Sequence, residues 1–287
     1  MLAFLTVRRF VLMIASLSAN VCVTITVVVL TMAAHGQAAE EIPGAKQIDR
    51  RAMQEVCESS ATISVDPNGH FRCAVCPSYT DFHGNRESFD LQAGYQGRFS
   101  TTNSEQLLLA LTGCEPHASG FGGSILLTRD GTVWKKSAYF KGQKPTKCLS
   151  FKARDGLDRL VCFAGDAHFG TSASWISALS YKDNSLHAET LLDVGGNMAL
   201  GSPAAGYCYE QDITTFEKVP SDTGFMVVVT QTRGLAPSGD ASCGETEIRM
   251  EPTQIVNLNF QFDSDHFALA PASKDSLQKV ENFLPHH

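Results

Sequence analysis

The sequence predicts a mainly β protein made of stacked antiparallel units, propeller-like or sandwich-like, with short helices near the N- and C-termini. Three observations support this class. Most of the 23 glycines and 11 prolines separate short apolar runs, as chains rich in strands require. Two pairs of these runs enclose typical hairpin turns. One motif recurs at a spacing that indicates stacked units.

The first 36 residues have the features of an export signal. Arg8–Arg9 precedes a nearly uncharged apolar run, Phe10–Ala34. We expect cleavage near Gly36–Gln37 or just after Ala38, where small residues suit a signal peptidase. The run is also long enough to cross a bilayer, so an uncleaved anchor is the alternative. The chain is therefore predicted to be secreted or periplasmic, and to meet a membrane only through this segment if it is retained.

Four segments are predicted along the chain. Residues 1–36 form the signal peptide, and residues 37–94 hold an N-terminal helix followed by a turn-rich segment with cysteines. Residues 95–272 form a β-rich, repeat-like domain, and residues 273–287 form a C-terminal helix. Within Ile42–Ser59 the apolar residues recur at helical spacing, which places the N-terminal helix there.

The charge of the chain argues against nucleic-acid binding. The formal net charge is −7, and removal of the two signal arginines makes the mature part −9 (−7 minus 2). Such a surface repels a phosphate backbone. Acidic surface instead favours solubility.

Cysteine usage agrees with export. Of nine cysteines, Cys22 lies in the signal, which leaves an even number for disulfides in an oxidising compartment. Two pairings have an argument from the chain. Cys148 and Cys162 flank the turn sequence 155–158, which would place them on adjacent strands of a hairpin. Cys208 and Cys243 are near each other in the chain. The disulfide candidates are Cys57, Cys73, Cys76, Cys114, Cys148, Cys162, Cys208 and Cys243.

Zinc binding is the competing interpretation of the same cysteines. Cys73 and Cys76, and likewise Cys114 and His117, have the two-residue gaps of a zinc knuckle. Export favours oxidation over metal binding. We therefore expect no cofactor, with zinc as an alternative that predicts a zinc-stabilised interaction domain.

Hairpins are predicted where turn residues separate two apolar runs. Asp130-Gly131 lies between 124–128 and 132–135, and an Asp-Gly pair there is a strong hairpin signal. A second hairpin is predicted across 182–185. The β-branched run 225–230 is predicted to be a buried strand. The run 107–111 fits a strand or a capped helix. Trp134 and Trp175 both fall in predicted strands, where a core position is expected.

Two stretches of the chain repeat one pattern. An apolar run is followed by a histidine, by a Phe-Gly-x-Ser element, by a strand and by a turn. Phe121-Gly122-Gly123-Ser124 and Phe169-Gly170-Thr171-Ser172 are the two elements, and a weaker third copy begins at Phe225. Periods of 20–50 residues indicate units that bury their faces against their neighbours.

The chain resembles the FG-GAP or VCBS-type repeats of exported β-propellers at Phe121–Ser124 with Leu126-Leu127, and at Phe151–Val161. The resemblance covers about residues 95–270. It implies a protein that binds or scaffolds. It also implies calcium at the aspartates before a strand, of which this chain keeps Asp155 and Asp158.

The C-terminal segment is similar to the opening of the outer-membrane protein A-like, peptidoglycan-binding domain. The residues concerned are Val256–Ser264 and the helically spaced apolar residues after Pro271. The aspartate and arginine with which that family binds peptidoglycan are absent. We therefore expect a last hairpin that turns at 263–265, followed by a terminal amphipathic helix.

No motif in the sequence predicts catalysis. The stretch from Gly170 to Ser174 lacks the final glycine of a nucleophile elbow, and no phosphate-binding loop is present. No catalytic or metal residue is therefore assigned. His117 and His168 occupy matching positions in the two repeats and are the candidate ligand-binding residues.

The predicted function is a non-catalytic binding or structural module of the periplasm or extracellular space. An exported hydrolase with a site assembled only in space is the alternative. The ligand, the partner and the oligomeric state are not predicted.

Overall fold

The computed structural model describes residues 40–41, 48–67, 70–82, 87–116, 121–168, 171–198, 202–204, 206–221, 223–236, 242–244 and 247–283. Side chains at 40–41, 60 and 166–168 also lie outside the description. Chain contacts separate Met1–Gln37 from Ala38–His287. Every described residue belongs to the second unit, so the predicted export signal stays a prediction.

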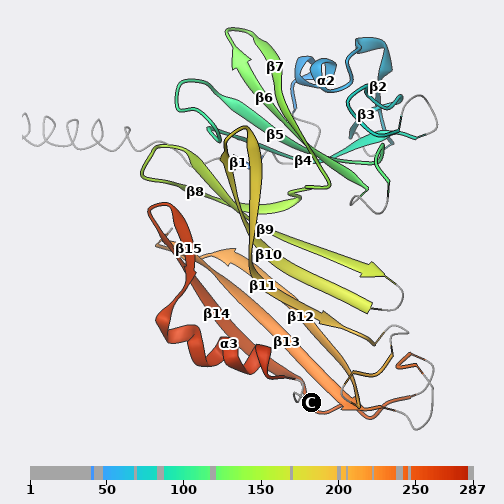
Figure 1. Cartoon of the computed structure of the whole chain (residues 1–287), viewed down its shortest axis with the longest axis vertical. Helices are drawn as coiled ribbons and strands as arrows, with labels where there is room; N and C mark the ends of the chain where they lie inside the picture. The colour runs from blue at the N-terminus through green and yellow to red at the C-terminus, as the bar shows by residue number, and fades with distance from the viewer. Residues whose placement is uncertain are drawn as a thin grey trace, which may run out of the picture. The chain divides into compact units, whose positions relative to one another are not determined.

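The described residues form two antiparallel sheets (Figure 1). The first sheet has the order β2-β3-β4-β5-β6-β7, and β1 pairs with β4. Its strands are β1 Glu40–Glu41, β2 Ile63–Val65, β3 Phe71–Cys73, β4 Phe89–Gly97, β5 Gln106–Thr112, β6 Gly122–Asp130 and β7 Val133–Lys141.

The second sheet is a meander with the order β15-β14-β13-β12-β11-β10-β9-β8. Its strands are β8 Lys147–Lys152, β9 Asp158–His168, β10 Thr171–Lys182, β11 Ser185–Gly196, β12 Tyr207–Lys218, β13 Gly224–Leu235, β14 Gln254–Asp263 and β15 His266–Leu269. The helices are α2 Arg50–Val56 and α3 Lys274–Glu281. The mainly β class with stacked antiparallel units and a short helix near each end is confirmed. Sheets of seven and eight strands are the sandwich-like form, whereas a propeller is built of four-stranded blades.

Turn chemistry explains three of the hairpins that the sequence predicts. Gly131 has a φ of 60° between β6 and β7. Asp183 and Asn184 have φ values of 51° and 59° between β10 and β11, and a turn with two positive φ angles matches the twist of the flanking strands. Gly156, with a φ of 81°, lies in the loop between β8 and β9. These three hairpins set the register of the strands around the candidate site.

The two copies of the predicted repeat fall on equivalent elements. Leu109 lies in β5, which pairs with β6, and Leu160 lies in β9, which pairs with β10. The run 107–111 is therefore a strand and not a helix. The histidine of the first copy and residues 169–170 of the second are outside the described residues. In the third copy, Met250 makes only an isolated bridge with Gly234.

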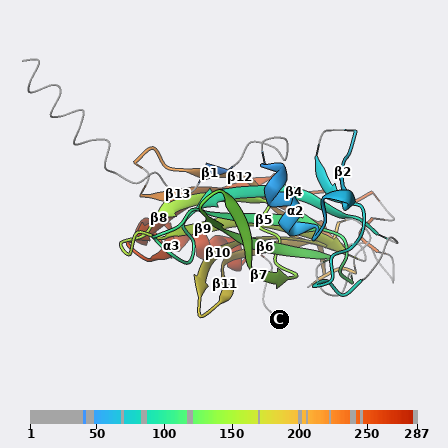
Figure 2. The ribbon, with the colours of Figure 1, turned by 90° about the horizontal axis from the view of Figure 1, so that it is seen from above.

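Three apolar cores hold the layers together. The first lies between α2 and one face of the first sheet, with Met53 and Leu109 fully buried (Figure 2). The second joins the sheets, where Tyr95 and Leu108 of the first pack with Leu160 of the second. The third lines the other face of the second sheet and includes Val280 of α3. Each sheet thus buries both of its faces over part of its area.

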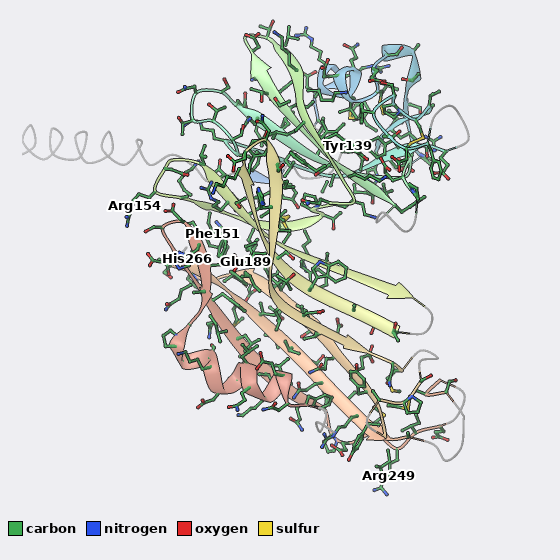
Figure 3. The ribbon with its side chains drawn as sticks, viewed as in Figure 1. Tyr139, Phe151, Arg154, Glu189, Arg249 and His266 are labelled. Carbon is green, nitrogen blue, oxygen red and sulfur yellow. A yellow bond between two sulfur atoms is a disulfide. The ribbon has the colours of Figure 1, made fainter. Side chains whose placement is uncertain are left out.

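The two end strands of the second sheet meet through side chains. The Phe151 ring of β8 lies 5.1 Å from Phe267 of β15 between ring centroids. The Arg154 N–H after β8 donates to the Ser264 carbonyl in the β14–β15 turn at 2.9 Å. Figure 3 shows Phe151, Arg154 and His266 on this side of the sheet. The third core is therefore enclosed by a curled sheet as well as by α3.

Two predicted segment boundaries can be compared with the elements. The boundary between 37–94 and 95–272 falls inside β4, so the structure does not divide the chain there. The turn-rich segment belongs to the first sheet, because its strand β3 pairs with β4 and its strand β2 pairs with β3. At the C-terminus, the β14–β15 hairpin turns at Ser264 and α3 follows, as expected.

Four disulfides join all eight cysteines outside the predicted signal. Cys148–Cys162 directly links paired positions of β8 and β9, and Cys208–Cys243 ties β12 to the segment before β14, so both predicted pairings are confirmed. The remaining bridges are Cys57–Cys73 and Cys76–Cys114. Cys73 and Cys76 belong to different bridges. The zinc-knuckle alternative is therefore wrong, since its thiolates are bonded to other sulfurs.

We expect the exported protein to contain no free thiol. Alkylation in denaturant without reductant should leave its intact mass unchanged, and alkylation after reduction should modify all eight cysteines of the four bridges. The same spectra report the N-terminal processing site. A mass increase before reduction would contradict the pairing.

Candidate functional site

A groove with a volume of about 580 Å³ lies between the two sheets. We define this inter-sheet groove by a floor from β9, β10 and β11 and by a rim from the 142–146 loop and the ends of β4 and β5. Its volume is in the range of small-molecule sites. Cys162 and Leu179 line it and also belong to the core that joins the sheets, so the groove adjoins that core.

Trp175 is the large side chain of the groove floor. It is half-buried and belongs to none of the three cores, whereas Trp134 is 7% exposed and packs in the first core. The expectation that both tryptophans are core residues is therefore wrong for Trp175. Around it the floor carries the small residues Ala164, Gly165 and Ser177. Its cross-strand partners are Ala164 on β9 and the exposed Asp193 on β11. Small neighbours leave one side of the indole open to a ligand.

The rim carries amides and hydroxyls. The Gln143 Nε2 donates to the Leu186 carbonyl at 3.1 Å, which fixes the amide. Its Oε1 is buried and has no hydrogen-bond partner among the described residues. Lys144, which is half-buried, donates to the Phe121 carbonyl at 3.4 Å and is the one charged residue among the described lining residues. The hydroxyls of Thr112 and Thr146 and the nearby Lys144 suit a ligand that offers hydroxyl groups.

The backbone holds this rim in place. The Gly142 N–H donates to the Gly122 carbonyl at 2.7 Å, and Pro145 is buried. On the floor, the Cys148–Cys162 bridge joins β8 to β9, and Cys162 lines the groove. Both sides of the groove are therefore constrained independently of any ligand.

A second cavity, of about 460 Å³, lies at the C-terminal end of α3. Its Arg233 donates to the Phe283 carbonyl at 2.5 Å and pairs with Glu251 at 3.1 Å. The buried Gln231 receives a bond from Gln211 at 3.2 Å. These polar groups attach the helix to β12 and β13, so we assign this cavity to α3 anchoring.

A buried carboxylate lies in the first sheet. Glu115 is fully buried; its Oε1 accepts from the Tyr139 hydroxyl at 2.7 Å, and its Oε2 lies 3.5 Å from Lys141. Burial, and then the bond to Glu115, raises the pKa of Tyr139 above its usual range. Lys141 also pairs with Asp81, across the Cys76–Cys114 bridge region. No member of this cluster lines the inter-sheet groove, so its role is to hold the segment after β3.

The candidate residues from the sequence are only partly placed. His117 lies outside the described residues, and His168 ends β9 opposite Thr171 with its side chain outside the description. Their predicted proximity stays a prediction. Asp155 accepts from Arg159 at 2.7 Å, and Asp158 is 2.7 Å from Lys152. The two aspartates implied for calcium are thus engaged by cations of the chain.

Within the described ranges, no group of three or more His, Cys, Asp or Glu residues is arranged to hold a metal ion. No helix in those ranges has the length and apolar character needed to span a bilayer. Comparison of the chain with protein-family models, with curated proteins and with solved structures found no match. Function therefore has to be inferred from the groove itself.

Proposed function

We propose that this chain is an exported, non-catalytic binding protein that holds a saccharide in the inter-sheet groove. Its compartment is the periplasm or the extracellular space. The observation that carries the proposal is the position of Trp175, half-buried on a floor of small residues and facing a rim of amides and hydroxyls.

The disulfides and the N-terminal segment support the compartment. Four bridges persist only where thiols are not kept reduced. The arginine pair and apolar run at residues 8–34 match an export signal. These two arguments are independent, since one concerns redox chemistry and the other the sequence pattern of a signal peptide.

The chemistry of the groove supports a saccharide. A sugar ring presents C–H groups on one face and hydroxyls around its edge. The indole of Trp175 offers apolar area to the face, while the hydroxyls of Thr112 and Thr146 line the groove and can bond to the sugar hydroxyls. Lys144 adds a donor that also suits an acidic sugar. A few fixed polar groups around an aromatic residue are typical of ligand pockets.

The same lining favours binding over hydrolysis. A glycosidase uses two carboxylates across the scissile bond. The lining residues in the described part of the chain carry amides, hydroxyls and one ammonium group. Asp193 of β11 pairs with Trp175 in the ladder, but hydrolysis needs a second carboxylate across the groove, and no described lining residue supplies one, which makes the binding function the better supported one.

A single-tryptophan variant tests the proposal. The chain has two tryptophans, so Trp134→Phe leaves Trp175 as the only fluorophore of that type. We expect titration with cellotriose, chitotriose or trigalacturonate to shift its emission in a saturable way. In isothermal titration calorimetry, which does not depend on the indole, Trp175→Ala should weaken binding at least about tenfold, which corresponds to about 1.4 kcal/mol. Trp175→Phe, which keeps an aromatic face, is the control and should bind with intermediate affinity. Absence of a saturable response to all three sugars would overturn the proposal.

A further inference from the structure

The second sheet is split between β11 and β12. Every other neighbouring pair in this sheet is joined over several residues, but β11 and β12 pair only at Gly196 with Glu210. From there the β10–β11 hairpin extends towards the first sheet, while β12 remains with β13 (Figure 1). Leu179 and Leu186 of the hairpin pack with Phe140 of the first sheet in the core that joins the sheets.

The split leaves one edge of β12 without a ladder. From Gln211 to Lys218, β12 pairs with β13, and no described strand pairs with its other edge. Backbone N–H and C=O groups at such an edge are a template for another strand. We call residues 211–217 of this stretch the β12 edge.

Acidic side chains accompany this edge. On β12, Glu210, Asp212 and Glu217 are exposed, and the register with β13 places them on the face opposite Ile213 and Phe216. Among the described residues, none of these three carboxylates forms an ion pair. This face of the β12 edge is therefore negative, whereas Lys218 lies over the Phe151 ring on the core side.

The opposite face of β12 is apolar. Ile213 and Phe216 belong to the third core together with Leu192 and Val194 of β11. A strand added to the β12 edge would thus present alternate side chains to two environments, since the side-chain period of a strand is two. One set would meet carboxylates and the other set would meet the rim of an apolar core.

We propose that the β12 edge binds an extended, basic segment of a partner protein, in which cationic and apolar residues alternate. The unpaired backbone contributes the ladder, the carboxylates select the charge, and the core rim selects the apolar side chains. This site is separate from the inter-sheet groove, so it does not rest on the proposed saccharide function.

Fluorescence anisotropy with a labelled peptide tests the inference. The probe is an eight-residue peptide of alternating lysine and valine, and the protein is the full exported chain. We expect saturable binding, no binding of the glutamate–valine counterpart, and at least a tenfold loss in D212K/E217K. The control D275K/E281K changes the net charge equally on exposed positions of α3 and should bind as the wild type does. Equal losses of peptide affinity in both variants would show that net charge alone causes the binding, and would overturn the proposal.

Backbone methylation separates strand pairing from simple charge attraction. One peptide carries N-methyl groups on its lysines and the other on its valines, so each blocks one hydrogen-bonding edge. We expect one of the two to lose binding and the other to retain it. If both bind equally well, no ladder forms and the inference is wrong.

Two further measurements distinguish the β12 edge from the inter-sheet groove, and a partner segment from a second copy of the chain. Trp175→Ala should bind the basic peptide normally, whatever its effect on sugars. Sedimentation of the wild type should show a monomer at the concentrations used. Self-association that D212K/E217K abolishes, without peptide binding, would assign the edge to a second copy of the chain and overturn the proposal.

Discussion

Phe225→Ala is expected to destabilise the protein by about 3–5 kcal/mol, the usual loss for a fully buried aromatic residue. Phe225 lies in β13 and is completely buried in the third core. Its ring stacks on Phe260 at 4.8 Å between centroids with an interplanar angle of 3°. Removal of the ring would leave a cavity at the centre of the curled second sheet.

The surrounding rings explain why this site cannot collapse easily. Phe216 and Phe267 meet Phe225 edge-on at 5.6 and 5.8 Å, and Phe151 lies at 6.4 Å. These rings come from β12, β15 and β8, so they are anchored on strands that cannot all shift towards one cavity. Limited relaxation is the condition under which the cavity contribution is largest.

Urea unfolding followed by near-ultraviolet circular dichroism, with the disulfides intact, measures the loss. Phe82→Ala is the matched control because Phe82 is 39% exposed, and its change should be within about 0.5 kcal/mol. Phe225→Leu should fall between the two. A Phe225→Ala protein as stable as the Phe82→Ala protein would show that the aromatic cluster does not form the core.

Much of the strand pattern could be predicted because its signals are local. The turn at Asp183-Asn184 uses residues that tolerate a positive φ, and β-branched residues such as Val227 and Val229 form a buried strand. The pairing of Cys148 with Cys162 follows from the same hairpin logic. Cys76–Cys114 joins segments 38 residues apart across the first sheet. No turn relates these two cysteines, so their pairing had no signal in the sequence.

The inter-sheet groove could not be predicted because its parts come from different sheets. Gln143 follows β7, whereas Trp175 is on β10, and only the packing of the two sheets brings them to one groove. A weak signal did exist. Ala164, Gly165 and Ser177 are small residues in otherwise apolar strands, and an aromatic residue among small neighbours is poorly covered. Burial of Trp175 in a core would require large neighbouring side chains, and the paired strand β9 does not supply them beside it.

Asp158→Ala is expected to reduce stability by about 3 kcal/mol, at the lower end for a broken buried pair. Asp158 is 2% exposed at the start of β9. Its Oδ2 accepts from the Arg98 N–H at 2.6 Å, and its Oδ1 is 2.7 Å from Lys152. Its own N–H donates to the Arg98 carbonyl at 2.7 Å. Arg98 directly follows β4, so this carboxylate links the first sheet to the second.

The size of the effect follows from what the substitution leaves behind. The Arg98 N–H would lose its acceptor, and an unsatisfied buried donor costs about 1–3 kcal/mol. Lys152 would lose its carboxylate, but its side chain is 26% exposed, so water compensates for part of that loss. Asp158→Asn keeps an oxygen for the Arg98 N–H and should therefore lose less than Asp158→Ala.

Asp155 provides the matched control, three positions away. Its side chain is 45% exposed, pairs with Arg159, and accepts from the Leu157 N–H at 2.9 Å; a single hydrogen bond contributes about 0.5–1.5 kcal/mol. Asp155→Ala should therefore cost about 1 kcal/mol, clearly less than Asp158→Ala, as measured in the same urea titrations. A double-mutant cycle with Lys152→Met then isolates the ion pair from the backbone bond. If Asp155→Ala and Asp158→Ala cost the same, the Arg98 N–H is satisfied in another way, and the Asp158 carboxylate does not link the two sheets.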